Sequence, residues 1–200
     1  MIKDLDGFIA DMIAFMGQWK IKSFVTVDPG WNTSCAYWSI ASLREITNYK
    51  IPLPDIQYFS VPKLLTKEEK LISAWEQFEI AKNYYLDRWG DTNWWYIEDA
   101  EFWIENNTSQ KSAFGKGSLK SEVSGSRGDL LTLSKLIGGY ANIVKPNFNL
   151  IPAQQWKGQM SKAATTIRVQ REIGFTSNND HIIDSIGMGL SFINNWRVTK

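Results

Sequence analysis

The chain has 200 residues, a mass of 22.9 kDa and a formal net charge of +1, and 44% of its residues are hydrophobic. This composition supports one packed core and excludes a disordered or low-complexity protein. The single cysteine, Cys35, excludes an intramolecular disulfide and a cysteine-based zinc site, which favours a reducing compartment. The sequence has no apolar run of about 18 residues and no signal-peptide pattern, so we expect a soluble, cytoplasmic protein without a membrane partner.

Charge is divided unevenly along the chain. Residues 1–105 hold 10 Lys/Arg and 16 Asp/Glu, whereas residues 106–200 hold 12 and 5. The basic second half favours a surface that faces a polyanion, and the acidic excess of the first half is either solvated or gathered into a cation site. Ordinary scatter of surface charge explains the same numbers equally well.

The beginning of the chain predicts a helix followed by three strands. Residues 4–19 place apolar side chains at helical spacing behind acidic residues, which predicts an amphipathic helix within an N-terminal segment, residues 1–20. Runs of β-branched and aromatic residues predict an antiparallel meander of strands over residues 21–27, 34–40 and 43–51. The first strand is followed directly by Asp28 and a Pro-Gly turn.

Helices and extended segments alternate in the rest of the chain. Helices are predicted over residues 66–89, 129–141, 161–173 and 178–196, and extended segments over residues 94–98 and 142–151. The first of these helices begins with a capping box, Thr66 and Glu69. Loops are expected over residues 52–62, which contain prolines, and over residues 106–128, which are rich in Gly, Ser, Asn and Lys. This order predicts an α/β domain with a mixed five-stranded sheet flanked by helices.

Candidate functional residues lie at strand ends and on the last helix. If the first and fourth strands are neighbours, the carboxylates of Asp28 and Glu98 emerge side by side, and His181 and Asp184 share one face of their helix. Asp180 lies beside them as a further candidate ligand. Carboxylates with an imidazole suit one or two magnesium ions, which can activate water to attack a phosphodiester. Each residue alone also fits an ordinary role as a turn, strand-end or capping residue.

A series of short motifs occurs in order over residues 21–195. They are DPG at residues 28–30, the strand around residues 36–37, YIE at 96–98, SRG at 126–128, IPAQQWKG at 151–158 and DHIIDSIGMG at 180–189. Together they resemble the motifs of RuvC-type Holliday junction resolvases, in particular phage-encoded relatives, within the RNase H-like superfamily. The resemblance implies a RuvC-like nuclease domain over residues 21–200, with the N-terminal helix as an addition.

The same resemblance implies an activity and assigns roles. It implies a crossover junction endodeoxyribonuclease that uses Mg²⁺, with Mn²⁺ as a substitute, and that acts as a homodimer on branched DNA, in the host cytoplasm if phage-encoded. The family's acids fall on Asp28, Glu98 and Asp184, and His181 stands where some members have histidine and others aspartate. Lys157 aligns with a basic residue near the scissile phosphate, where it can neutralise developing charge. A solvated surface lysine is the equal alternative.

The basic loop over residues 106–128 supplies candidate DNA contacts. They are Lys111, Phe114, Lys116, Lys120 and Arg127. The cations suit phosphates and the aromatic ring suits stacking on an unpaired base, while a flexible linker is the alternative. Two other functions stay open: an RNase H-like nuclease acting on replication or packaging intermediates or on RNA–DNA hybrids, and a catalytically idle nucleic-acid-binding protein. The acids count against the second, because carboxylates without metal repel phosphate.

Overall fold

The computed structural model describes residues 23–39, 51–90, 94–99, 128–158 and 160–195. The predicted N-terminal helix lies outside these residues, as do the five candidate DNA contacts Lys111, Phe114, Lys116, Lys120 and Arg127. Within the described part, no helix is long and apolar enough to span a membrane.

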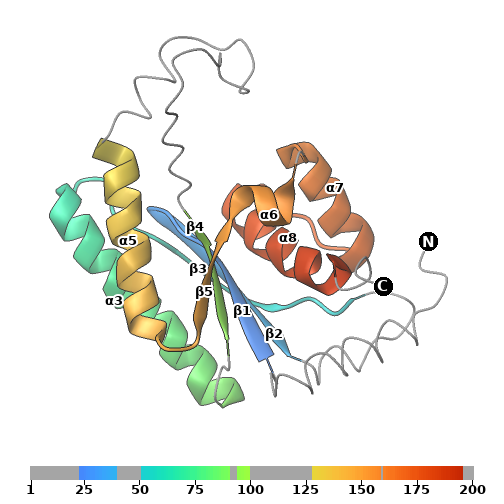
Figure 1. The fold of residues 1–200 in the computed structure, drawn as a ribbon, viewed down its shortest axis with the longest axis horizontal. Helices are drawn as coiled ribbons and strands as arrows, with labels where there is room; N and C mark the ends of the chain where they lie inside the picture. The colour runs from blue at the N-terminus through green and yellow to red at the C-terminus, as the bar shows by residue number, and fades with distance from the viewer. Residues whose placement is uncertain (1–22, 40–50, 91–93, 100–127, 159, 196–200) are drawn as a thin grey trace, which may run out of the picture.

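A mixed five-stranded sheet forms the centre of the fold (Figure 1). The strands are β1 (Ser23–Asp28), β2 (Asn32–Ser39), β3 (Asp55–Ser60), β4 (Trp95–Asp99) and β5 (Phe148–Pro152). They lie in the order β3-β2-β1-β4-β5, with the first three antiparallel and with β4 parallel to both β1 and β5. The predicted fold class is confirmed, including the neighbouring positions of the first and fourth strands.

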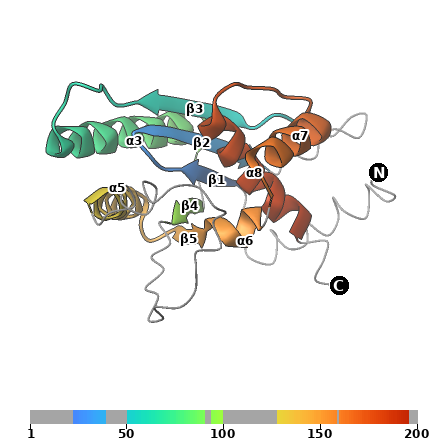
Figure 2. The same ribbon diagram turned by 90° about the horizontal axis from the view of Figure 1, so that it is seen from above.

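Helices cover both faces of the sheet. Figures 1 and 2 show α3 (Lys67–Trp89) and α5 (Gly128–Val144) on one face, and α6 (Ala153–Lys157), α7 (Lys162–Ile173) and α8 (Asp180–Asn195) on the other. The predicted capping box is present at the start of α3, where Thr66 and Glu69 exchange side-chain to backbone hydrogen bonds. The predicted bounds of α3, α7 and α8 agree with the structure within two residues.

The strand beside β2 lies later in the chain than the sequence pattern predicts. Of the strand expected over residues 43–51, only Ile51 is described, and it is not in a strand. Instead β3 lies within residues 52–62, for which a loop is predicted, so that prediction is wrong. Prolines flank β3 without entering its ladder, and the partly exposed side chains of this edge strand lack a strong apolar pattern.

The segment between α5 and β5 also differs from the prediction. Helix α5 continues to Val144, so residues 142–144 are helical rather than extended, and β5 begins only at Phe148. Helix α6 is not predicted, because its five residues are too few to show a helical period of apolar side chains. This short helix contributes directly to the candidate site.

The two larger of three apolar clusters in the described residues hold the layers together. The cluster between the sheet and helices α3 and α5 is rich in buried aromatic rings: Tyr37, Phe78, Tyr85, Trp95 and Tyr140. The cluster on the opposite face joins the sheet to α7 and α8: Phe24, Trp38, Val169, Ile186 and Leu190 are among its members. The central strands β1 and β2 are therefore buried on both faces, and the buried Thr26 and Ser34 are hydrogen-bonded.

Side-chain alternation in β1 and β4 determines where the strand-end carboxylates lie. Val27 and Ile97 are buried in the cluster that faces α3 and α5. Thr26 faces the opposite side, where its hydroxyl donates a hydrogen bond to a carbonyl of α8. Because successive side chains of a strand point to opposite faces, Asp28 and Glu98 lie on the side of α6 and α8.

Candidate active site

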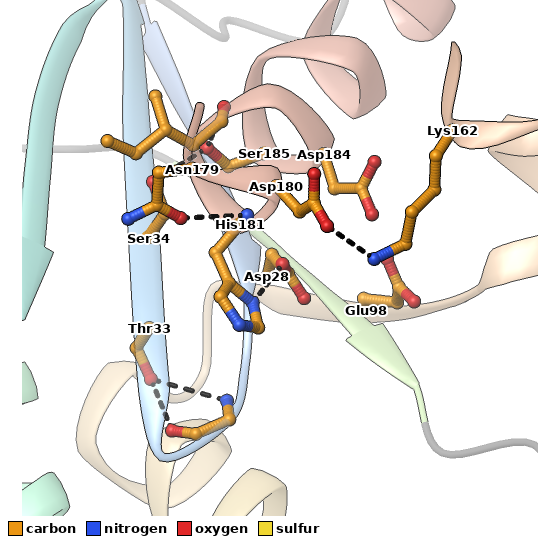
Figure 3. Close-up of polar contacts among 12 residues, drawn as sticks. Asp28, Thr33, Ser34, Glu98, Lys162, Asn179, Asp180, His181, Asp184 and Ser185 are labelled. Carbon is orange, nitrogen blue, oxygen red and sulfur yellow. Dashed lines mark hydrogen bonds and ion pairs between the residues drawn. The ribbon is translucent and has the colours of Figure 1, made fainter. Parts of the chain in front are cut away.

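Asp28 and Glu98 lie next to one another at the ends of adjacent strands. The parallel register pairs Val27 with Ile97, so each carboxylate comes one residue beyond the same pair. Neighbouring strands are about 4.8 Å apart, which brings the two acids to one edge of the sheet. The side chain of Asp28 is 13% exposed, so this charge is largely removed from water. Figure 3 shows both acids below the first turns of α8.

Asp28 is paired with the only histidine of the chain. A hydrogen bond of 2.7 Å joins His181 Nδ1 to Asp28 Oδ2 (Figure 3). An ionised carboxylate only accepts, so Nδ1 carries the proton and Nε2 is left for another partner. This hydrogen bond raises the pKa of His181, while burial raises the pKa of Asp28 and the imidazole acts against that increase. At its backbone, His181 N–H donates to the side chain of Asn179, which precedes α8.

Glu98 is held by a tryptophan of α6. Trp156 Nε1 donates a hydrogen bond of 3.1 Å to Glu98 Oε2, and the indole is buried. Burial raises the pKa of Glu98 to about 7, the charges of Asp28 and Asp184 add to the increase, and the Trp156 hydrogen bond acts against it. The register of β1 and β4 puts Glu98 beside Asp28, and Lys157, the residue after Trp156, contacts Asp184 of α8.

The two acids of α8 are four residues apart and each faces a lysine. Lys157 Nζ lies 3.0 Å from Asp184 Oδ2, and both side chains are largely buried. Lys162 Nζ lies 2.7 Å from Asp180 Oδ2, but this pair is at the rim, with 66% and 59% of the two side chains exposed (Figure 3). Asp184 therefore lies within the site, whereas Asp180 is on its outer edge.

Helix α8 is fixed on the sheet by buried polar and close apolar contacts. The Thr26 hydroxyl donates to the Ser185 carbonyl at 2.7 Å, and the hydroxyls of Ser34 and Ser185 are 2.8 Å apart. A Cβ atom at Gly189 would collide with the Trp38 indole, so helix and sheet approach closely there. These contacts determine the position of the helix that carries His181 and Asp184.

The donor set fits a hard divalent cation. The ends of β1 and β4 and the first turns of α8 supply three carboxylates, and burial raises the pKa of two of them, Asp28 and Glu98, which is costly unless a positive charge is near. Carboxylate oxygens with one imidazole are ligands that Mg²⁺ and Mn²⁺ accept. In the described part of the chain, no group of three or more His, Cys, Asp or Glu side chains is already arranged around a common ion position.

The sequence analysis misses Trp156, which contacts a site acid, and Lys162, which lies at the rim of the site. Trp156 belongs to the motif at residues 151–158, but the sequence does not indicate which carboxylate its indole contacts. Lys162 is an ordinary lysine near a helix start, and its pairing with Asp180 needs α7 and α8 to be adjacent. The apolar character of Trp156 is the only signal in the sequence, and it predicts that the side chain is buried without indicating its partner.

The fold is similar to that of RuvC. The sequence matches no protein-family model and no curated protein. A structure of RuvC from Thermus thermophilus is similar with a TM-score of 0.57 and 10% sequence identity, over 88% of this chain and 97% of that one. T. thermophilus RuvC in complex with a Holliday junction substrate gives a TM-score of 0.56 and 12% identity, over 88% and 96%. At these identities the similarity establishes the fold.

Proposed function

We propose that this protein is a metal-dependent, structure-selective endonuclease that hydrolyses phosphodiesters in branched DNA, with four-way junctions as the preferred substrate. The observation that supports it best is the arrangement of three acids on a RuvC-like sheet: Asp28 and Glu98 follow paired strand residues, and the adjacent Trp156 and Lys157 contact Glu98 and Asp184. Such a cluster is unfavourable for a protein that only binds nucleic acid, because the carboxylates repel phosphate.

In this proposal Asp28, Glu98, His181 and Asp184 would hold the metal. Magnesium or manganese bound there supplies a Lewis acid for the phosphate and lowers the pKa of a coordinated water. The buried surroundings of Asp28 strengthen its interaction with cations, since electrostatic forces are larger away from water. The Asp28 carboxylate accepts the proton of His181 Nδ1 and so leaves Nε2 as the unprotonated nitrogen of the neutral ring.

Lys157 supplies positive charge beside the carboxylates. Its ammonium group is anchored at Asp184, from where a scissile phosphate next to the metal would be within reach of the long side chain. A cation held at that position neutralises charge that develops on the phosphate oxygens in the transition state. Asp180 lies at the rim and is paired with Lys162, so we do not assign it a role in the reaction.

Branched DNA and a homodimer complete the proposal. T. thermophilus RuvC is described in complex with a Holliday junction substrate, and this chain shares its fold. A two-fold homodimer would present two carboxylate clusters to a symmetric four-way junction and so make paired cuts. The basic second half of the sequence would contribute phosphate contacts, among them the lysines of the loop over residues 106–128.

Cleavage of labelled DNA tests the proposal. Four-way, Y-shaped, single-stranded and linear duplex DNA are incubated with Mg²⁺, with the native protein beside Asp28→Asn, and RNA–DNA hybrid is added as a further substrate. We expect paired symmetric nicks in the four-way junction, lost in the variant and in chelator. The amide oxygen that replaces the Asp28 carboxylate can still accept from His181, so the change removes charge while keeping the hydrogen bond. Cleavage of other branches or hybrids at equal rates would identify a broader nuclease, and intact binding without cleavage would favour an idle binding protein.

A further inference from the structure

The ammonium group of Lys157 is paired with Asp184. Its Nζ lies 3.0 and 3.1 Å from the two oxygens of Asp184, and only 19% and 15% of the two side chains are exposed. Lys157 therefore provides, from within the chain, a positive charge that compensates the largely buried Asp184.

The position of this lysine is well defined by its neighbours. Lys157 is the last residue of α6, and its Nζ lies 5.2 Å from the centre of the adjacent Trp156 ring, where a cation is attracted by the aromatic face. The carbonyl of Trp156 accepts a hydrogen bond of 2.8 Å from Ser191 in α8, which ties the short helix to the helix of Asp184. The lysine is thus directed toward Asp184 by the packing of α6 against α8.

We propose that Lys157 is a built-in counter-cation that occupies Asp184 while the site holds no metal and that a divalent cation must displace. This inference rests on the metal site of the proposed function, and it adds that Lys157 and the metal compete for Asp184. An ammonium group and a divalent cation held by the same largely buried carboxylate repel one another, and this repulsion disfavours binding of both to Asp184 at once. Metal binding therefore breaks the ion pair, and the released ammonium stays beside the cluster, where it can contact a phosphate.

The competition has a measurable consequence for metal affinity. Breaking a largely buried ion pair costs free energy, so the native protein binds metal more weakly than a variant that lacks the lysine. The rim pair of Lys162 and Asp180 provides a matched control, because it also joins a lysine to an acid of α8 but is mostly exposed, and exposed pairs contribute little.

Mn²⁺ binding, measured by electron paramagnetic resonance without DNA, tests the inference. We expect Lys157→Met to bind Mn²⁺ about tenfold more tightly than the native protein, which corresponds to about 1.4 kcal/mol. Lys162→Met is expected to change the affinity less than about twofold. A second measurement uses the native chain alone: the rate at which Lys157 is acetylated, followed by mass spectrometry, should rise when Mn²⁺ is added, while the rate at Lys162 stays constant.

The outcomes separate this inference from the proposed function. Tighter binding by Lys157→Met together with faster acetylation of Lys157 in Mn²⁺ supports the displacement. Equal affinity in both proteins, or unchanged acetylation, overturns the displacement and leaves the metal site in place. Absence of Mn²⁺ binding in the native protein and in Lys157→Met overturns the metal site and the displacement together.

Discussion

His181 Nδ1 and Asp28 Oδ2 lie 2.7 Å apart although 153 residues separate them in the sequence. The contact joins the first turn of α8 to the end of β1, and it affects the protonation of His181 and the charge of Asp28. Asp28 determines which nitrogen of the imidazole is protonated, and His181 compensates part of a largely buried negative charge. The pair therefore links the stability of the fold to the arrangement of the candidate site.

The stability that His181 contributes should depend on pH. The Asp28 hydrogen bond raises the pKa of His181 above 6.5, so the pair stabilises the fold fully below that value and less as pH rises through the raised pKa. We expect His181→Ala to lower the free energy of unfolding more at about pH 6 than at about pH 9. Urea denaturation at the two pH values measures this. Lys162→Met is the control, because both partners of that exposed pair stay charged, and an equal effect of pH on both variants would contradict the assignment.

Glu98 should destabilise the metal-free protein at alkaline pH. Its pKa rises from 4.5 to about 7 on folding, so the folded state gains stability from the proton below pH 4.5 and loses it as pH rises through 7. Glu98→Gln keeps an oxygen that accepts from Trp156 and removes the charge. We expect this variant to be more stable than the native chain at about pH 8, by on the order of 2 kcal/mol, and not at about pH 5. Chemical denaturation in chelator provides the comparison, and identical pH profiles would refute the prediction.

The Trp156 indole should stabilise the fold through its N–H hydrogen bond as well as through the packing of its ring. Trp156→Phe keeps an aromatic ring but removes the hydrogen bond to Glu98. A hydrogen bond to a charged group contributes about 1.5–3 kcal/mol, and the smaller ring adds a packing loss. The decrease in unfolding free energy should therefore be larger at about pH 8, where Glu98 is ionised, than at about pH 5. A decrease independent of pH would show that only packing is lost.

Gly189 should be required for the close approach of α8 to the sheet. A Cβ atom there would collide with Trp38, which is fully buried and cannot move aside freely, so we expect Gly189→Ala to cost about 1–3 kcal/mol. Gly138 in α5 is the matched control, since a Cβ atom there meets nothing within 4 Å. Gly138→Ala should stabilise by about 0.5–1 kcal/mol through helix propensity. Thermal unfolding of both variants measures the contrast, and a neutral Gly189→Ala would mean that α8 can shift.

The sequence by itself determined the elements that follow from local pattern and capping. The period of apolar residues and the Thr66 capping box locate α3, and the last two helices are equally clear. Strand alternation places Asp28 and Glu98 on one face once β1 and β4 are neighbours. These features depend on residues close together in the chain, so a local pattern is enough to reveal them.

Only the tertiary structure decided which groups the candidate residues contact. The pairs of Glu98 with Trp156 and of Asp184 with Lys157 join segments 58 and 27 residues apart. The strand β3 likewise depends on pairing with β2, because an edge strand with partly exposed side chains has a weak pattern of its own. Such contacts follow from how helices and sheet pack, and packing depends on the whole chain rather than on any single segment.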